Sequence, residues 1–218
     1  MIENKTGLSL TDGIKDYIVS YLLDGTDSLE TVIDKVNTSK RNIFLADVEE
    51  ETGAAIETLI RLYNEIDNEL EIPKEERVPI KIFVNSNGGA LESALTICDA
   101  ISLSSTPIWT INTGKAYSCG ALVFLCGHKR YTFPNASFLI HEGSVNGRLA
   151  MDRNKFDNFS DFYKTQVIKT KGIICEKTLI SEELYSEHEK DDWWFDANTA
   201  LNLKVADEVV TPEVYAKL

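Results

Sequence analysis

Three stretches in the first third of the chain repeat their hydrophobic residues with the period of an α-helix. The first follows Thr11 and ends before Gly25, the second follows Ser28, and the third covers residues 56–66. In each stretch, apolar side chains recur at intervals of three and four residues, which places them on one face of a helix. We therefore predict three amphipathic helices, with residues 41–45 as a short buried strand between the second and the third.

The pattern changes after residues 68–79, which carry two prolines and many charges and are predicted to be a surface connection. Beyond them, short apolar runs alternate with amphipathic stretches. We predict a turn at residues 85–89 and an exit loop that begins at Gly114. The succession of strand, helix, strand, helix and strand is typical of an α/β protein with a mainly parallel sheet. The predicted strands are residues 80–84, 108–111 and 138–140, and the predicted helices are residues 91–101 and 118–126.

The chain is strongly acidic, with 22 lysines and arginines against 35 aspartates and glutamates and a net charge of −13. This charge repels phosphate backbones and anionic lipids, so nucleic acid and membrane surfaces are poor partners. The first residues lack a basic segment followed by an apolar stretch, and no apolar run approaches the roughly 20 residues that span a bilayer. The four cysteines form no C-x-x-C pair, and three lie in apolar segments typical of buried free thiols. We therefore expect a cytoplasmic protein.

Ser118 lies where a predicted strand passes into a predicted helix, within residues 114–121. Such a junction exposes a side chain and directs unpaired helix N–H groups toward the same place, as a nucleophile with an oxyanion hole requires. The alternative interpretation is an ordinary helix N-cap. The G-x-S-x-G motif of the α/β-hydrolases does not fit, because Ala116 stands where its first glycine belongs.

A serine nucleophile needs a base, and the chain has three histidines. His128 lies in the polar turn 127–130, and His188 lies in an acidic stretch that we expect to be solvated. Only His141 ends an apolar strand, at the sheet edge where α/β proteins bind ligands. A hydrogen-bonded histidine at a strand end is the alternative interpretation.

The third member of a triad cannot be chosen from 35 carboxylates by the residues alone. Residues 190–195 are suggestive, because their adjacent aromatic side chains could bury a carboxylate beside an imidazole. The pair Gly88 and Gly89 is either a simple turn or a bare backbone whose N–H groups approach a substrate carbonyl.

Four segments resemble, in order, the signatures of the Clp protease proteolytic subunit (ClpP) family, and the resemblance covers about residues 41–210. The segments are Asn85-Ser86-Asn87-Gly88-Gly89, Gly114-Lys115-Ala116-Tyr117-Ser118-Cys119-Gly120-Ala121, Pro134-Asn135-Ala136-Ser137-Phe138-Leu139-Ile140-His141 and Asp192-Trp193-Trp194-Phe195-Asp196-Ala197. The resemblance implies an α/β, crotonase-like superhelix of βαβ units with a projecting strand-helix handle at about residues 142–175. It divides the chain into a divergent helical segment, residues 1–40, and a protease domain, residues 41–218.

The resemblance also implies a role for individual residues, and it implies neither a metal nor a cofactor. Residues 142–147 correspond to the strand that pairs with the substrate backbone, and residues 150–171 to the handle helix. The matching positions are Ser118 as nucleophile, His141 as general base, Asp192 as orienting carboxylate, Gly89 and Cys119 as oxyanion hole, and Gly88, Glu142, Gly143 and Ser144 as substrate-binding residues.

The implied function is that of a serine endopeptidase working inside a chamber of homo-oligomeric rings. The resemblance implies heptameric rings stacked in pairs and polypeptides fed by an AAA+ ATPase unfoldase. Three alternatives stay open: a specialised or virus-type maturation protease, a structural ring subunit with little activity, and an acyl-CoA enzyme of the crotonase type. The last would leave Ser118 and His141 without a role.

The chain also departs from the family pattern. Asn87 replaces the usual proline of the glycine turn, and Glu142-Gly143 replaces the usual Gln-Pro after the base. Asp191 stands where the family often has an arginine used between rings, and Lys204 stands at a usual glycine. Residues 1–40 do not resemble the family's axial-pore hairpin.

Overall fold

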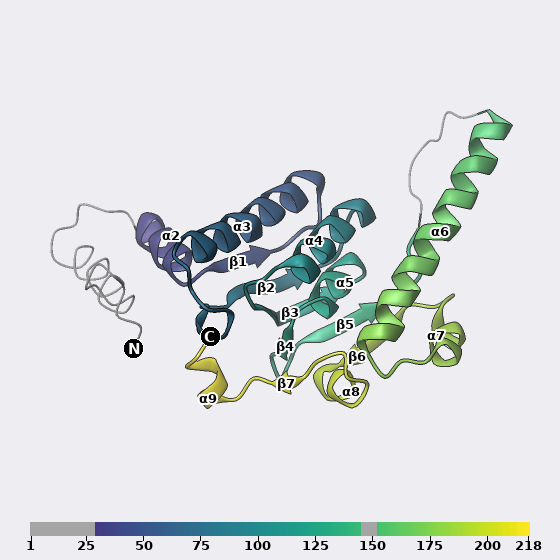
Figure 1. Ribbon diagram of the computed structural model, residues 1–218. Helices are drawn as coiled ribbons and strands as arrows, with labels where there is room; N and C mark the ends of the chain where they lie inside the picture. Colours follow the sequence, from purple (N-terminus) through teal and green to yellow (C-terminus); the bar gives the residue numbers. More distant parts are fainter. Residues whose placement is uncertain (1–28, 145–151) are drawn as a thin grey trace.

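A seven-stranded sheet forms the centre of the structure, a computed structural model that describes residues 29–144 and 152–218 (Figure 1). Five strands follow in the order β1-β2-β3-β4-β7, and β5 joins the sheet through β3 and carries β6. Every pairing is parallel except the antiparallel pair of β5 and β6. The strands are β1 (Asn42–Leu45), β2 (Ile80–Ser86), β3 (Ile108–Tyr117), β4 (Lys129–Thr132), β5 (Ser137–Ile140), β6 (Trp193–Asp196) and β7 (Glu208–Val209).

The sheet divides at β3, which is long enough to pair with two successive partners. Its first half pairs with β4, from Trp109 opposite Lys129 onward. Its second half pairs with β5, from Lys115 opposite Ser137 to Tyr117 opposite Leu139. The C-terminal ends of β3 and β5 therefore lie side by side.

Helices α3 (Glu50–Glu69), α4 (Leu91–Leu103) and α5 (Cys119–Leu125) lie together over one face of the sheet (Figure 1). In α4 the side chains of Ala94, Ile97, Cys98 and Ile101 are buried, at the helical spacing that the sequence shows. Every residue of α5 is buried, so this short helix is apolar on all sides. The largest core side chains include Ile82, Ile108, Phe124 and Phe138.

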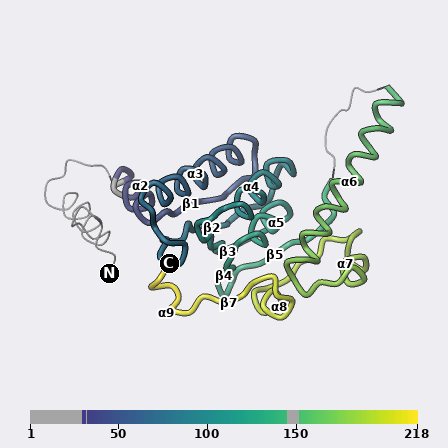
Figure 2. The backbone as a smooth tube through the Cα atoms, in the orientation of Figure 1, coloured from purple at the N-terminus to yellow at the C-terminus, as the bar shows by residue number. Residues whose placement is uncertain are grey.

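The remaining helices surround this body. Helix α2 (Leu29–Ser39) lies next to β1, whereas α6 (Arg153–Lys177) extends far beyond the sheet as a projecting arm (Figure 2). The other elements are the 3₁₀ turn η1 (Lys74–Glu76) and helices α7 (Glu182–His188), α8 (Ala197–Asn202) and α9 (Pro212–Tyr215). Side chains cap four helices by accepting a backbone N–H: Asp152 for α6, Ser181 for α7, Asp196 for α8 and Thr211 for α9.

The predicted fold class is confirmed, since a mainly parallel sheet is covered by helices as the pattern required. The helix predicted before Gly25 lies outside the described residues. The helix expected at residues 150–171 is longer at its C-terminal end, since α6 continues to Lys177. Residues 142–144 form no strand, and residues 145–147 of that predicted strand lie outside the described part of the chain.

Two local predictions were wrong. The exit loop at Gly114 is absent, because β3 continues to Tyr117 along its new partner β5. The polar turn 127–130 is shorter than expected, because Lys129 and Arg130 already belong to β4. Arg130 can enter the strand since Asp207 receives its guanidinium in two hydrogen bonds of 2.7 and 3.1 Å.

Lys204 shows what the departure from the family glycine entails. Its φ is +55°, in the left-handed region that favours glycine. A side chain there costs about 1–2 kcal/mol. Lys204 thus has a strained backbone conformation just before the last strand.

A buried ion pair fastens α3 to the start of β1. Arg41 donates two hydrogen bonds, of 2.6 and 2.7 Å, to the carboxylate of Asp67, whose side chain is fully buried. Thr106 donates a third, of 2.7 Å, to the same carboxylate. Burial by itself raises the pKa of Asp67, but these hydrogen bonds and the charges of Arg41 and Arg77 outweigh it and hold the pKa below its ordinary value.

We expect Asp67→Asn to lower the free energy of unfolding at neutral pH by about 3–5 kcal/mol, because it leaves the Arg41 guanidinium buried without a counter-charge. The depressed pKa means that Asp67 stabilises the fold above the ordinary carboxyl range and that this contribution is lost as the pH falls through the lower folded-state pKa. Urea unfolding at pH 7 and at acid pH measures both effects. The gap between wild type and Asp67→Asn should shrink at acid pH, and Asp47→Asn, at an exposed carboxylate, is the control. An equal gap at both pH values would contradict the assignment.

Candidate active site

Ser118 has a strained backbone at the end of β3. Its φ and ψ are +53° and −123°, and its hydroxyl makes no cap hydrogen bond to α5. Its N–H instead donates to the carbonyl of Leu139 in β5, at 2.9 Å. The N-cap interpretation therefore does not describe this residue. A serine held on a sharp strand-to-helix turn is the arrangement of a nucleophile elbow, although the sequence lacks its first glycine.

His141 and Asp192 complete a chain of hydrogen bonds with Ser118. Nε2 of His141 lies 2.7 Å from Oγ of Ser118, and Nδ1 lies 3.1 Å from Oδ1 of Asp192. A carboxylate can only accept, so Nδ1 carries the proton in the neutral ring and Nε2 accepts from the serine hydroxyl. This is the tautomer that can take a proton from the serine.

Strand register explains why these residues meet. β5 and β6 are antiparallel with Ile140 opposite Trp193, so the next residues, His141 and Asp192, come opposite each other. The ring of Trp194 packs against that of Tyr117 with centroids 4.9 Å apart, which ties β6 to the end of β3. This register places Asp192, and not Asp191, opposite His141.

The expected burial of the carboxylate was wrong. The side chain of Asp192 is 58% exposed, although Trp193 and Phe195 follow it closely. Trp193 stacks instead on His188, with ring centroids 4.2 Å apart, so His188 is not the solvated residue that the acidic stretch suggested. His128 is also engaged in the fold, since its Nδ1 accepts the N–H of Ile108 at 2.9 Å.

The turn at Gly88 and Gly89 is shaped by its contacts on both sides. A Cβ on Gly88 would lie 2.9 Å from Cβ of Ser118, and one on Gly89 would lie within the backbone of Val48. Both residues have positive φ, of +103° and +148°. Val48 donates to the carbonyl of Gly88 and accepts from Ala90, which holds the turn in place. Only glycines fit this close approach to Ser118.

Asn87, in place of the family proline, makes a contact that proline could not. Its Oδ1 accepts a hydrogen bond of 2.8 Å from Nζ of Lys115 in β3. This contact could not be predicted from the sequence, since the two residues are 28 positions apart. The hydrogen bond links the glycine turn to the strand that ends at the serine.

Cys119 follows Ser118 and begins α5. Burial raises the pKa of its thiol, while hydrogen bonds from the Gly89 backbone and with the Ser118 hydroxyl act against that rise. The thiol, the glycine turn and the serine are therefore in mutual contact. Gly89, Ser118 and Cys119 line one and the same cavity.

A cavity of about 540 Å³ opens beside Ser118 and reaches across to α6. Of the four residues expected to bind substrate, Glu142, Gly143 and Ser144 line this cavity and Gly88 does not. The opposite wall, which α6 contributes, was not predicted from the sequence. Its lining residues there are Phe159, Phe162, Tyr163, Gln166, Thr170 and Ile174.

Neither a metal centre nor a membrane span is found in the part of the chain that the structure describes. Within residues 29–144 and 152–218, no three His, Cys, Asp or Glu side chains are grouped so that they could hold a metal ion. None of the helices described there is long and apolar enough to cross a membrane. The cysteines are free thiols, and Cys98, Cys119 and Cys126 are buried as predicted.

A parallel sheet that brings a serine, a histidine and a carboxylate together at its edge defines an α/β protein with the side-chain arrangement of a serine hydrolase. The particular family follows from comparison with known proteins. Residues 28–213 match the family model of the Clp protease, and the chain belongs to this family of peptidases. The predicted resemblance is thereby confirmed.

Individual relatives agree with this placement. The chain is 28% identical over 188 residues to ATP-dependent Clp protease proteolytic subunit 1 of Chlamydia muridarum, covering 84% of this chain and 92% of the relative. It is 33% identical over 141 residues to proteolytic subunit 3 of Streptomyces coelicolor, covering 63% of each. Among solved structures, a ClpP1 mutant from Listeria monocytogenes has the same fold, with a TM-score of 0.70 at 22% identity, covering 84% of this chain and 98% of that one.

The register of β5 and β6 leads to a prediction about the two neighbouring aspartates. Asp192→Asn should slow labelling of Ser118 by a fluorophosphonate about 10²–10⁴-fold, because an amide at this position no longer selects the tautomer with a proton on Nδ1. The upper end of this range is expected for a buried carboxylate. Asp192 is exposed, so a water molecule can take over part of its interaction with the imidazole, which moves the expected effect toward the lower end. Asp191→Asn is the matched control and should label at nearly the wild-type rate. The rate of adduct formation by intact mass measures both, and a larger effect at Asp191 would contradict the arrangement.

Proposed function

We propose that this chain is a serine endopeptidase in which Ser118 is the nucleophile, His141 the general base and Asp192 the carboxylate that orients it. The observation that carries the proposal is the 2.7 Å contact between Nε2 of His141 and Oγ of Ser118. It occurs at a serine whose backbone is strained and whose hydroxyl does not cap the following helix. A serine with only a structural role would not require a strained backbone conformation.

In the proposed reaction, Oγ of Ser118 attacks the carbonyl carbon of a peptide bond while Nε2 of His141 takes the hydroxyl proton. The N–H groups of Gly89 and Cys119 stabilise the negative charge that forms on the carbonyl oxygen. His141 then returns the proton to the leaving amine, and an acyl-enzyme remains on Ser118. Water, activated by the same imidazole, hydrolyses this ester and restores the serine.

The segment 142–144 and the glycine turn would receive the substrate backbone. Glu142, Gly143 and Ser144 follow directly after the base and border the cavity beside Ser118. Gly88 supports this arrangement indirectly, because its missing side chain lets the turn approach the serine. A polypeptide laid along the segment would place one carbonyl at Ser118 and one side chain in the cavity.

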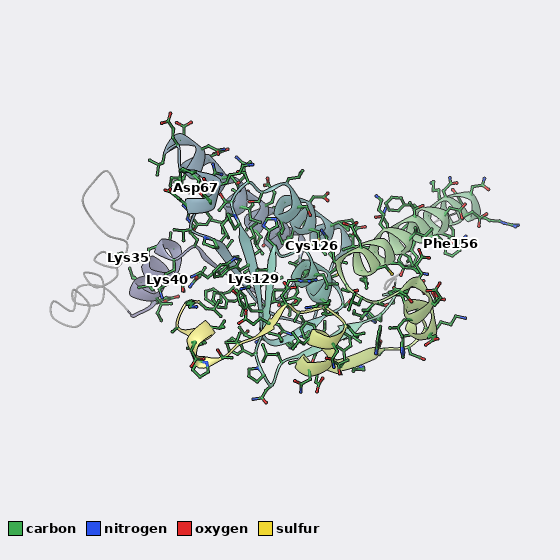
Figure 3. The ribbon with its side chains drawn as sticks, turned by 60° about the horizontal axis from the view of Figure 1, so that its bottom comes forward. Lys35, Lys40, Asp67, Cys126, Lys129 and Phe156 are labelled. Carbon is green, nitrogen blue, oxygen red and sulfur yellow. The ribbon has the colours of Figure 1, made fainter. Side chains whose placement is uncertain are left out.

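We also propose that the chain works as a ring-shaped homo-oligomer in the cytoplasm, supplied with unfolded polypeptides by an ATPase partner. The relatives are named as subunits of an ATP-dependent protease, which supports the last point. The arm formed by α6 supports assembly, since Phe156 and Phe162 are each 53% exposed and Ile168 is 69% exposed. Figure 3 shows Phe156 on the outer part of this arm, far from the sheet. Exposed apolar side chains on such a helix are typical of an interface.

The nucleophile is tested by Ser118→Ala. We expect this variant to lose peptide cleavage by on the order of 10⁶ in kcat and to lose all fluorophosphonate labelling, because within residues 29–144 and 152–218 no other serine shares the contact with His141. Hydrolysis of a fluorogenic peptide and intact mass after labelling measure the two effects. Ser137→Ala, at a serine whose hydroxyl contacts Tyr117 in the fold, should keep its label and is the control. An adduct that persists in Ser118→Ala would overturn the proposal.

Assembly is tested by native mass spectrometry. The expected species is a ring of seven subunits or a pair of such rings, with the α6 arms in contact. Replacing Phe156 and Ile168 by Lys should break pairs of rings into single rings, because a lysine ammonium cannot be buried there without a partner. A fully active monomer of the wild-type chain would contradict the proposal.

A further inference from the structure

Gln166 is a buried polar residue in the wall of the cavity beside Ser118. It lies on α6 and is only 7% exposed, yet it borders the same cavity as Ser118 and Cys119. In the described part of the chain, no hydrogen bond joins its amide to another residue. An occupant of the cavity that covers the amide without pairing with it would leave a buried polar group unsatisfied, which is costly.

Among the described residues, the polar side chain nearest along the helix does not pair with the amide of Gln166. The hydroxyl of Thr170, one turn along α6, already donates to the carbonyl of Val167 at 2.9 Å. The cavity lining also includes apolar side chains, namely Leu122, Leu125, Phe159, Phe162 and Ile174. The amide of Gln166 is therefore one of a few polar groups in a wall that also offers apolar surface, as expected of a group that fixes the orientation of a ligand.

The charges around the cavity have one sign. Glu92 and Glu142 are among its lining residues, and among the residues described there is neither a lysine nor an arginine. A carboxylate that entered the cavity would meet two like charges and no cation. An ammonium group would be attracted by these two carboxylates, but it could satisfy only the carbonyl half of the amide of Gln166 and would lose its own hydration. A neutral occupant fits best.

We propose that Gln166 is a specificity-determining residue that selects glutamine as the substrate residue supplying the scissile carbonyl. A carboxamide offers both a donor and an acceptor, so it can satisfy both halves of the Gln166 amide in a pair of hydrogen bonds. Its methylene stem fits the apolar walls. Glutamine is the longer of the two carboxamide side chains and suits a partner on the wall opposite Ser118. The inference rests on the proposed peptidase function, because it concerns the substrate of the same site.

Leucine is the informative competitor. It fills the cavity with a similar volume of apolar groups but leaves the amide of Gln166 unpaired and without access to water. A site with a hydrogen-bonding group rejects a side chain that cannot pair with it more strongly than a purely apolar pocket distinguishes two sizes. The wild-type chain should therefore favour glutamine over leucine by at least about tenfold in kcat/KM.

The experiment uses four fluorogenic peptides that differ only in the residue before the cleaved bond: glutamine, leucine, glutamate or lysine. They are compared on the full-length assembled wild type and on Gln166→Leu, which removes the polar atoms and keeps an apolar side chain of similar bulk. The variant should lower the glutamine-to-leucine ratio of kcat/KM by at least about tenfold. Thr165→Leu makes the same kind of change at an exposed neighbouring position on α6, outside the cavity, and should leave the ratio unchanged.

A binding measurement separates this inference from the proposed function. Product-like peptides that end in glutamine or leucine are titrated against Ser118→Ala and against Ser118→Ala with Gln166→Leu. A preference for glutamine that is lost with Gln166→Leu supports the inference even if no peptide is cleaved, and absence of all cleavage would then count against the peptidase function alone. An unchanged ratio in both cleavage and binding, or an equal or greater preference of the wild type for leucine, glutamate or lysine, overturns the inference.

Discussion

The parallel pairing of β3 with β5 determines where the two reacting side chains of the candidate site can lie. β3 ends at Tyr117 and β5 at Ile140, and Ser118 and His141 are the next residues of each strand. The N–H of Ser118 donates to Leu139, so the backbone of the serine is fastened to the strand that carries the base. The 2.7 Å contact between the two side chains follows from this pairing. Without the pairing of β3 with β5, the strained backbone of Ser118 would relax.

The remaining parts of the site are arranged around the same strand end. β6 pairs with the far side of β5 and brings Asp192 opposite the base, and the glycine turn after β2 approaches the serine from the other side. The departures from the family pattern lie at the edges of this arrangement. Asn87 stands in place of the usual proline and accepts a hydrogen bond from Lys115. Lys204 stands in place of the usual glycine and has a left-handed backbone conformation.

Much of this could be predicted from the sequence, because strand and helix periods are local. The periodicity of Ala94, Ile97 and Ile101 and the apolar run at residues 80–84 sufficed for the central elements. Ser118 and His141 could be singled out from the residue types at strand ends. Asp192 could be chosen only through the resemblance, because its position depends on the register of β5 and β6, which is a tertiary contact. Its exposure was missed for the same reason, since Trp193 packs on His188.

The cavity could not be predicted, because its two walls belong to segments far apart in the chain. Gln166 is one polar residue on a helix rich in polar residues, and only the packing of α6 against α5 shows that it is buried. Gly114 was misread because glycine often ends a strand, whereas here the second half of β3 is held by β5. Each of these errors arises where a contact between distant segments outweighs a local preference.

The position of Asp192 in the chain has a consequence for biosynthesis. β6 is formed by residues 193–196, so the strand that brings the carboxylate to the base leaves the ribosome after most of the sheet and after the whole of α6. Long-range strand pairing is slow compared with local structure, and here it joins segments 51 residues apart. A nascent or partly folded chain therefore has the serine and the histidine before it has a carboxylate to orient the imidazole. If Asp192 orients the imidazole as proposed, the order of synthesis would thus leave His141 without its orienting partner until β6 has paired with β5.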